Sequence, residues 1–150
     1  MSPHAAELFE ATPALAGRCN LVPPKTSHHA KKIVKFGEFT KLADKPELVA
    51  ARQIWQVSLQ PFQPAAPLDG PLRLELELTW PWRGGDSARK RRAGRIPCDV
   101  KPDADNIAKA IIDTMVRLCF LRADQQIAVL VVKKWIGDHP GLEFRIWRLF

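Results

Sequence analysis

The chain has 150 residues, of which 46% are hydrophobic and 26% are charged, and its formal net charge is +7. This composition predicts one folded domain and excludes a disordered tail or a set of membrane spans, because no apolar stretch approaches the roughly 20 residues of a span. The N-terminal residues lack the basic and apolar segments of a secretion signal, so we expect a cytoplasmic protein. The positive charge favours an anionic partner, and nucleic acid is the commonest.

The three cysteines, Cys19, Cys98 and Cys119, include no pair at C-x-x-C spacing. An odd number without that spacing argues against a disulfide framework and against a zinc site. Cys119 lies in an apolar stretch, and we therefore expect it to be a small core residue.

Residues 1–18 show no clear hydrophobic period, and we expect them to form a flexible N-terminal arm ahead of a domain at 19–150. Residues 33–39 predict a short pair of strands with Gly37 at the turn. Four lysines lie in or just before this pair: Lys25, Lys31, Lys32 and Lys35. They could contact phosphates or form an ordinary solvated surface, and the sequence leaves both interpretations open.

Residues 44–59 have the pattern of an amphipathic helix. Asp44 is a candidate N-cap, Pro46 suits the first turn, and Glu47 stands three residues after Asp44, as in a capping box. The apolar residues recur at helical spacing and should face the core: Leu48, Ala51, Trp55 and Leu59. The prolines at 61, 64 and 67 then predict an extended linker.

The clearest strand covers residues 72–80, where leucines and Trp80 alternate with polar residues. Residues 83–95 predict a flexible basic loop with glycines at 84, 85 and 94. Its cations are Arg83, Arg89, Lys90, Arg91, Arg92 and Arg95. With only one acid, Asp86, among them, we favour contact with a phosphate backbone over an ordinary solvated loop.

The C-terminal third predicts a helix at 103–118 and strands at 127–135 and 142–149, the last two joined by a turn at 137–141. The order of elements indicates a single α+β domain, in which a mixed β-sheet packs with two main helices.

Acidic residues cluster on one face of the predicted helix at 103–118. Asp103 is a plausible N-cap, and Asp105, Lys109 and Asp113 follow one another at spacings of four residues. Two apolar residues, Ile112 and Val116, lie close to this face. A dimer contact and a second core contact would each explain them.

Asp124 stands 21 residues after Asp103 and just before the strand at 127–135. A helix start and a strand start can place three carboxylates around one ion, and such oxygen ligands select Mg²⁺ or Mn²⁺. Lys109 could then stabilise negative charge in a phosphoryl transition state. Spacing alone also allows a capping Asp103, a surface pair of Asp105 with Lys109, and a turn residue at 124.

The segment KPDADNIAKAIIDTM at 101–115, followed by FLRADQQI at 120–127, resembles the signature of RusA-like Holliday junction resolvases. Val-Pro-Pro-Lys-Thr-Ser at 22–27 also looks like the opening of phage-type members. The resemblance places the family's metal-binding and catalytic acids at Asp103, Asp105 and Asp124, and its lysine at Lys109. It implies a RusA-like homodimer that binds four-way junctions and makes paired symmetric nicks with Mg²⁺ or Mn²⁺ in DNA recombination and repair.

The candidate DNA-binding residues are Arg89, Lys90, Arg91, Arg92, Arg95 and Lys101. One departure from the family pattern is Ala123, which stands where the family usually has the first acid of an Asp-Asp pair. We expect Asp124 to be the ligand and activity to survive. The alternatives are a branched-DNA-binding module without cleavage and a nuclease that prefers flaps or forks, with a nucleotidyl-transfer enzyme as a weaker candidate.

Overall fold

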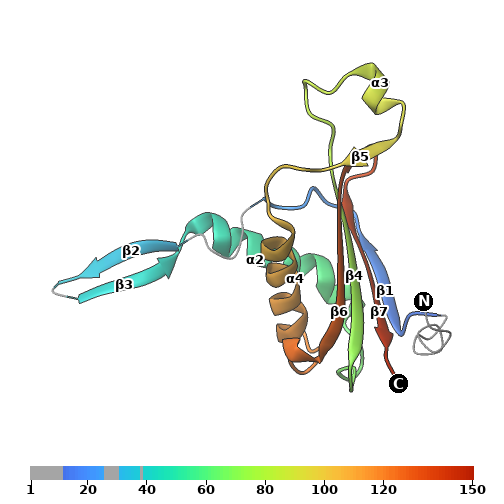
Figure 1. Ribbon diagram of the computed structural model, residues 1–150. Helices are drawn as coiled ribbons and strands as arrows, with labels where there is room; N and C mark the ends of the chain where they lie inside the picture. The colour runs from blue at the N-terminus through green and yellow to red at the C-terminus, as the bar shows by residue number, and fades with distance from the viewer. Residues whose placement is uncertain (1–11, 26–30, 38) are drawn as a thin grey trace.

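A five-stranded mixed sheet with helices on one face forms the body of the protein (Figure 1). The computed structural model describes residues 12–25, 31–37 and 39–150. The strands of the main sheet are β1 Leu15–Cys19, β4 Leu72–Trp80, β5 Arg95–Pro97, β6 Ile127–Gly137 and β7 Gly141–Arg148. The helices are α2 Pro46–Leu59, α3 Ala88–Arg91 and α4 Ala104–Arg117, with 3₁₀ turns at Gln60–Phe62 and Asp124–Gln126. The predicted single α+β domain with a mixed sheet is confirmed.

A separate hairpin of β2 Lys31–Phe36 and β3 Phe39–Asp44 extends away from the sheet (Figure 1). Gly37 lies at its turn with a φ of +59°, a backbone conformation that glycine adopts without strain. The predicted strand pair is therefore confirmed, although both strands are longer than the sequence indicates.

The strand order β1-β7-β4-β6-β5 places β4 at the centre, parallel to β6 and antiparallel to β7. Parallel strands need a long crossover, and here the crossover contains α3, β5 and α4. Because α4 returns the chain to the start of β6, its N-terminus points toward the edge of the sheet where β4 and β6 end, and the segment after β5 runs back along the sheet before α4 begins (Figure 1). The basic loop begins at that same edge, beyond which α3 lies (Figure 1).

The core lies between the sheet and the two long helices. The leucines of β4 at 72, 74, 76 and 78 are all buried, as the alternation predicts. From α2 the four predicted core residues are also buried. Ile112 belongs to the same core, and Val116 packs partly buried against it, so a core contact accounts for Ile112, while a dimer contact at Val116 stays a prediction.

The start of α2 differs from the prediction. Asp44 is the last residue of β3, where it pairs with Lys31, and Lys45 occupies the N-cap position without a side-chain capping bond. The predicted N-cap at Asp44 is wrong because strand pairing includes that residue, whereas Pro46 does lie in the first turn. The proline segment also forms a 3₁₀ turn before it extends.

The N-terminal segment joins the sheet, which differs from the predicted arm. Leu15–Cys19 forms β1 and pairs with β7, while residues 1–11 lie outside the described residues, so for them the arm stays a prediction. Gly17 permits this pairing, because a Cβ there would lie 2.6 Å from the Phe62 ring and 2.8 Å from the Phe144 ring. The two rings pack edge to face across the glycine.

The placement of the cysteines corrects a third expectation. Cys119 is exposed, with a φ of 58° just after the end of α4, so the prediction of a core residue is wrong. Cys19 is the buried cysteine, and burial raises the pKa of its thiol to about 11. Within the described residues, the structure has no helix that is both long and apolar enough to cross a membrane.

Candidate active site and nucleic-acid interface

Asp103 occupies the N-cap position of α4, as predicted, with φ −64° and ψ 143°. Its carboxylate makes no capping hydrogen bond. Among the described residues it accepts one side-chain hydrogen bond, a long one of 3.5 Å from Asn106. Asp105 follows in the first turn and is exposed. Helix capping therefore does not engage the Asp103 carboxylate, and both acids face solvent.

Lys109, one turn after Asp105 on α4, forms ion pairs with two acids. Its Nζ lies 2.9 Å from Asp113 Oδ1 and 3.0 Å from Asp124 Oδ2. Hydrogen bonds to Asp113 and then to Asp124 raise the pKa of Lys109, and the same contact lowers the pKa of Asp124. Lys109 and Asp124 are thus both charged at neutral pH, and the structure brings these two candidates into direct contact.

Gln126 fixes the turn that presents Asp124. Its Oε1 accepts hydrogen bonds from the backbone N–H groups of Arg122 and Ala123, at 2.7 and 3.1 Å. Its Nε2 donates to the carbonyls of Leu68 and Gly70, at 2.9 and 3.0 Å. The sequence analysis missed this residue, because Ala123 lacks the side-chain oxygen of a capping box and only the glutamine half of that pattern is present.

The four predicted catalytic residues form an extended row and not one cluster. Asp113, which Lys109 contacts together with Asp124, lies about 12 Å along the helix axis from Asp105, since each residue rises by about 1.5 Å. In the described ranges, no three His, Cys, Asp or Glu side chains lie close enough to hold a metal ion. The carboxylate oxygens of Asp103, Asp105 and Asp124 suit Mg²⁺ or Mn²⁺ in kind, but they are not gathered into a ligand shell.

A shallow depression of about 370 Å³ lies beside Asp124. It is lined by Asp113, Val116, Arg117, Arg122, Ala123 and Asp124. Ala123 thus lies in the depression, so an aspartate at this position would add a carboxylate next to Asp124.

The basic loop is more ordered than predicted, because it contains the helical turn α3. Ser87 caps this turn, and its Oγ accepts a hydrogen bond from the Lys90 backbone N–H at 3.2 Å. Asp86 is buried and accepts hydrogen bonds from the Arg83 backbone N–H at 2.8 Å and from the Arg83 guanidinium at 2.9 and 3.1 Å. The lone acid therefore anchors the loop.

The loop cations fall into two groups. Arg91 donates to the carbonyls of Asp86 and Arg83, and Arg95 pairs with Glu77 while lying 4.0 Å from the Trp135 ring centroid. The second group has exposed side chains that make no hydrogen bond or ion pair among the described residues: Arg89, Lys90 and Arg92. This second group is available for phosphates.

The family model described as Endodeoxyribonuclease RusA matches residues 22–147. The chain belongs to the RusA endodeoxyribonuclease family. The resemblance recognised in the segments at 101–115 and 120–127 is thereby confirmed, and membership makes the chain an endodeoxyribonuclease. A comparison with curated proteins finds no match.

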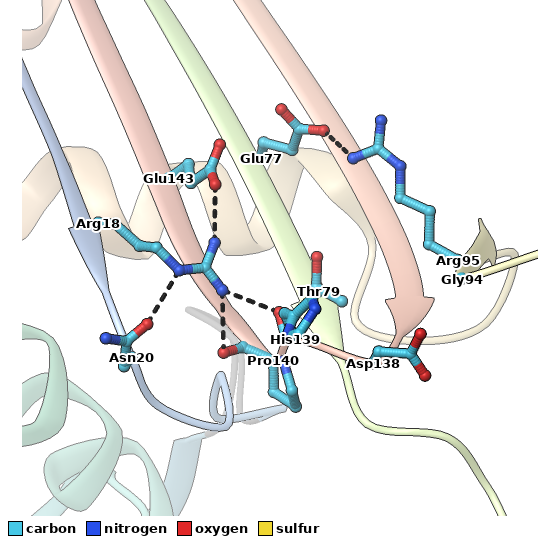
Figure 2. A pocket seen from close by; sticks show the side chains of 10 residues that line it. All are labelled: Arg18, Asn20, Glu77, Thr79, Gly94, Arg95, Asp138, His139, Pro140 and Glu143. Atoms are coloured by element: carbon cyan, nitrogen blue, oxygen red, sulfur yellow. Dashed lines mark hydrogen bonds and ion pairs between the residues drawn. The ribbon is translucent and has the colours of Figure 1, made fainter.

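A second cavity of this RusA-family chain, about 560 Å³ in volume, lies on the sheet face opposite the helices. Figure 2 shows that Arg18 points toward Glu143 and Arg95 toward Glu77, whereas Asp138 points away from both pairs. Arg18 donates to Glu143 at 2.7 Å, to Asn20 at 2.9 Å and to the His139 carbonyl at 2.9 Å. Because these groups satisfy one another and lie away from α4, we assign them a structural role.

Low pH should weaken the Asp86–Arg83 ion pair that holds the basic loop of this RusA-family chain. Hydrogen bonds from the Arg83 side chain and backbone lower the pKa of Asp86 from 3.8 to about 2. Since the pKa is lower in the folded state, the ionised carboxylate stabilises the fold above its usual pKa, and this contribution is lost as the pH falls through about 2. Asp86→Asn should therefore lower the urea midpoint at pH 7, and the difference from the parent should shrink toward pH 2. A difference that stays constant with pH would contradict this role.

Proposed function

We propose that this chain is a metal-dependent endonuclease that resolves Holliday junctions by paired symmetric nicks in DNA recombination and repair. The observation that supports this most directly is the row of charged side chains that runs along α4 to the turn carrying Asp124. Asp103 and Asp105 are open at its N-terminus, and Lys109 holds Asp124 one turn later. The basic loop, with its exposed unpaired cations, lies beyond the end of the sheet toward which the N-terminus of α4 points (Figure 1).

In this proposal Asp103, Asp105 and Asp124, whose oxygen atoms suit the ion but lie apart in this structure, would come together to hold Mg²⁺, with Mn²⁺ as a substitute. When bound, such an ion supplies charge that polarises the phosphodiester and favours ionisation of a water molecule. Lys109 orients Asp124 through their hydrogen bond and keeps it ionised. Its ammonium group also offers positive charge to the phosphate oxygens as negative charge develops. Gln126 positions the turn that carries Asp124.

We further propose a cytoplasmic homodimer, because a two-fold assembly matches the symmetry of a four-way junction and can place two cuts on opposing strands. In each protomer, Arg89, Lys90, Arg92 and Lys101 would contact phosphates and set the position of the DNA. The exposed Lys35 on the β2–β3 hairpin is a further candidate contact.

The test is cleavage of a synthetic four-way junction labelled on each strand in turn, beside a linear duplex, a flap and a fork, in Mg²⁺, Mn²⁺ or EDTA. Paired nicks at symmetric positions that require metal and favour the junction would support the proposal. Faster cleavage of the flap or the fork would assign a different branched substrate.

A junction-binding module without cleavage is the second candidate, and the observation that favours it is Ala123 in the depression beside Asp124. Tight junction binding without nicks in any metal would support this candidate. If Ala123→Asp then cleaves the junction in the same assay, the absence of cleavage in the parent protein is due to the missing carboxylate.

A further inference from the structure

An apolar pocket of about 230 Å³ lies between the start of the basic loop and the approach to α4. Its apolar walls are formed by Val22, Trp80, Pro81, Trp82, Val100 and Ile136. Cys98 also lines it and is half-buried. The volume is below the roughly 300–1,000 Å³ of pockets for drug-sized ligands, so the occupant is smaller than these.

The charged groups of this pocket all have one sign. Its lining includes Lys25, Arg83 and Lys101, and no acidic side chain. Arg83 is paired with Asp86, whereas Lys25 and Lys101 have no ion-pair partner among the described residues. An apolar interior with cations around it suits a flat apolar group that carries negative charge on either side, and a nucleotide in a DNA strand has this form.

The aromatic walls are held in place before any ligand arrives. Trp80 Nε1 donates to the Pro23 carbonyl at 2.8 Å, and Trp82 Nε1 donates to Asp138 at 2.7 Å. The Arg91 guanidinium lies 5.9 Å from the centroid of the Trp82 ring, within the range of a cation–π contact. Fixed aromatic side chains bind bases well, because little conformational freedom is lost on binding.

We propose that this pocket receives one unstacked nucleobase of the DNA, next to the phosphate that is cut. This inference rests on the proposed function, because Lys101 stands only two residues before Asp103 and thereby links the pocket to the catalytic helix. Bases at the branch point of a junction lack a continuous stack, so placing one in the pocket costs less than it would in a duplex.

Cys98 provides a probe inside the pocket. The experiment uses a Cys119→Ser, Asp105→Asn protein kept in EDTA, and the alkylation rate of Cys98 is measured with and without saturating junction DNA. Cys19 should not react, because it is buried and its thiol resists ionisation. We expect the junction to slow alkylation several-fold. A single abasic site near the branch point should restore the rate, while abasic sites elsewhere should not. Protection that no abasic site relieves would overturn the proposal.

A second measurement does not depend on the thiol. The intact junction should bind more tightly than the abasic one by about 5- to 150-fold, the range that base–aromatic stacking supplies. Val22→Phe should fill the pocket and make the two affinities equal, whereas Val57→Phe, on the exposed surface of α2, should preserve the difference. Equal affinities in the parent protein would overturn the proposal.

The two proposals fail in distinguishable ways. A parent protein that nicks junctions, but shows neither protection of Cys98 nor an effect of any abasic site, would refute the base pocket alone. A protein that neither binds nor cleaves a junction would refute both.

Discussion

Asp105→Asn should reduce cleavage of a four-way junction by about 100-fold or more, comparable to the loss of a charge-stabilising group in other active sites. Asp105 is exposed and has no hydrogen-bond or ion-pair partner among the described residues, so stability should change by less than about 0.5 kcal/mol. Junction binding should be unchanged or tighter, because one negative charge is removed near the phosphates. Single-turnover cleavage and a binding titration on the same junction measure the two effects separately.

Asp99→Asn is the matched control for this experiment. Asp99 is also exposed and lies four residues before Asp103, so the substitution removes the same charge from the same region without touching the row on α4. Its cleavage rate should stay close to that of the parent. If Asp105→Asn and the parent protein cut at equal rates, Asp105 has no catalytic role.

Joint neutralisation of Arg89, Lys90 and Arg92 to glutamine should weaken DNA binding and reduce its dependence on salt. Each phosphate contact contributes a slope of about 0.9 to the plot of log affinity against log salt, so three lost contacts should flatten it by about 2.7. These three side chains are exposed and unpaired within the described part of the chain, so the loop itself should keep its structure. Binding titrations between low and moderate salt give the slope.

Two further variants separate phosphate contact from general charge. Arg148→Gln removes an exposed cation at the far end of β7 and should leave the slope unchanged. Arg91→Gln should disturb the loop, because Arg91 holds two loop carbonyls. A slope that survives the triple neutralisation would remove these three residues from the interface.

The regular elements could be predicted because their signals are local. The alternation over β4 and the helical spacing in α2 and α4 each place one apolar face without knowledge of any partner. The errors occurred where distant residues decide the conformation. β1 is an edge strand whose partner is more than a hundred residues away. Asp44 pairs with Lys31 in the β2–β3 hairpin, and this pairing prevents it from capping α2.

The candidate site was predictable in its residues but not in its geometry. The spacing of four residues placed Lys109 and Asp113 on one face of α4, but it could not show that Lys109 bridges Asp113 and Asp124. The roles within the basic loop were also hidden. Arg91 and Arg95 carry the same charge as their neighbours, and only the structure shows that Arg91 bonds a loop carbonyl and that Arg95 pairs with Glu77.

The strand order has a consequence for how the chain folds. β7, the last of the five strands in the sequence, lies between β1 and β4, so the first strand can join the sheet only through the last. Contacts between residues so distant in sequence impose a large loss of chain entropy before they form, and proteins rich in them fold slowly. Substitutions that weaken β7 should therefore slow the assembly of the whole sheet, including the central strand β4, whose buried leucines share the core with α4.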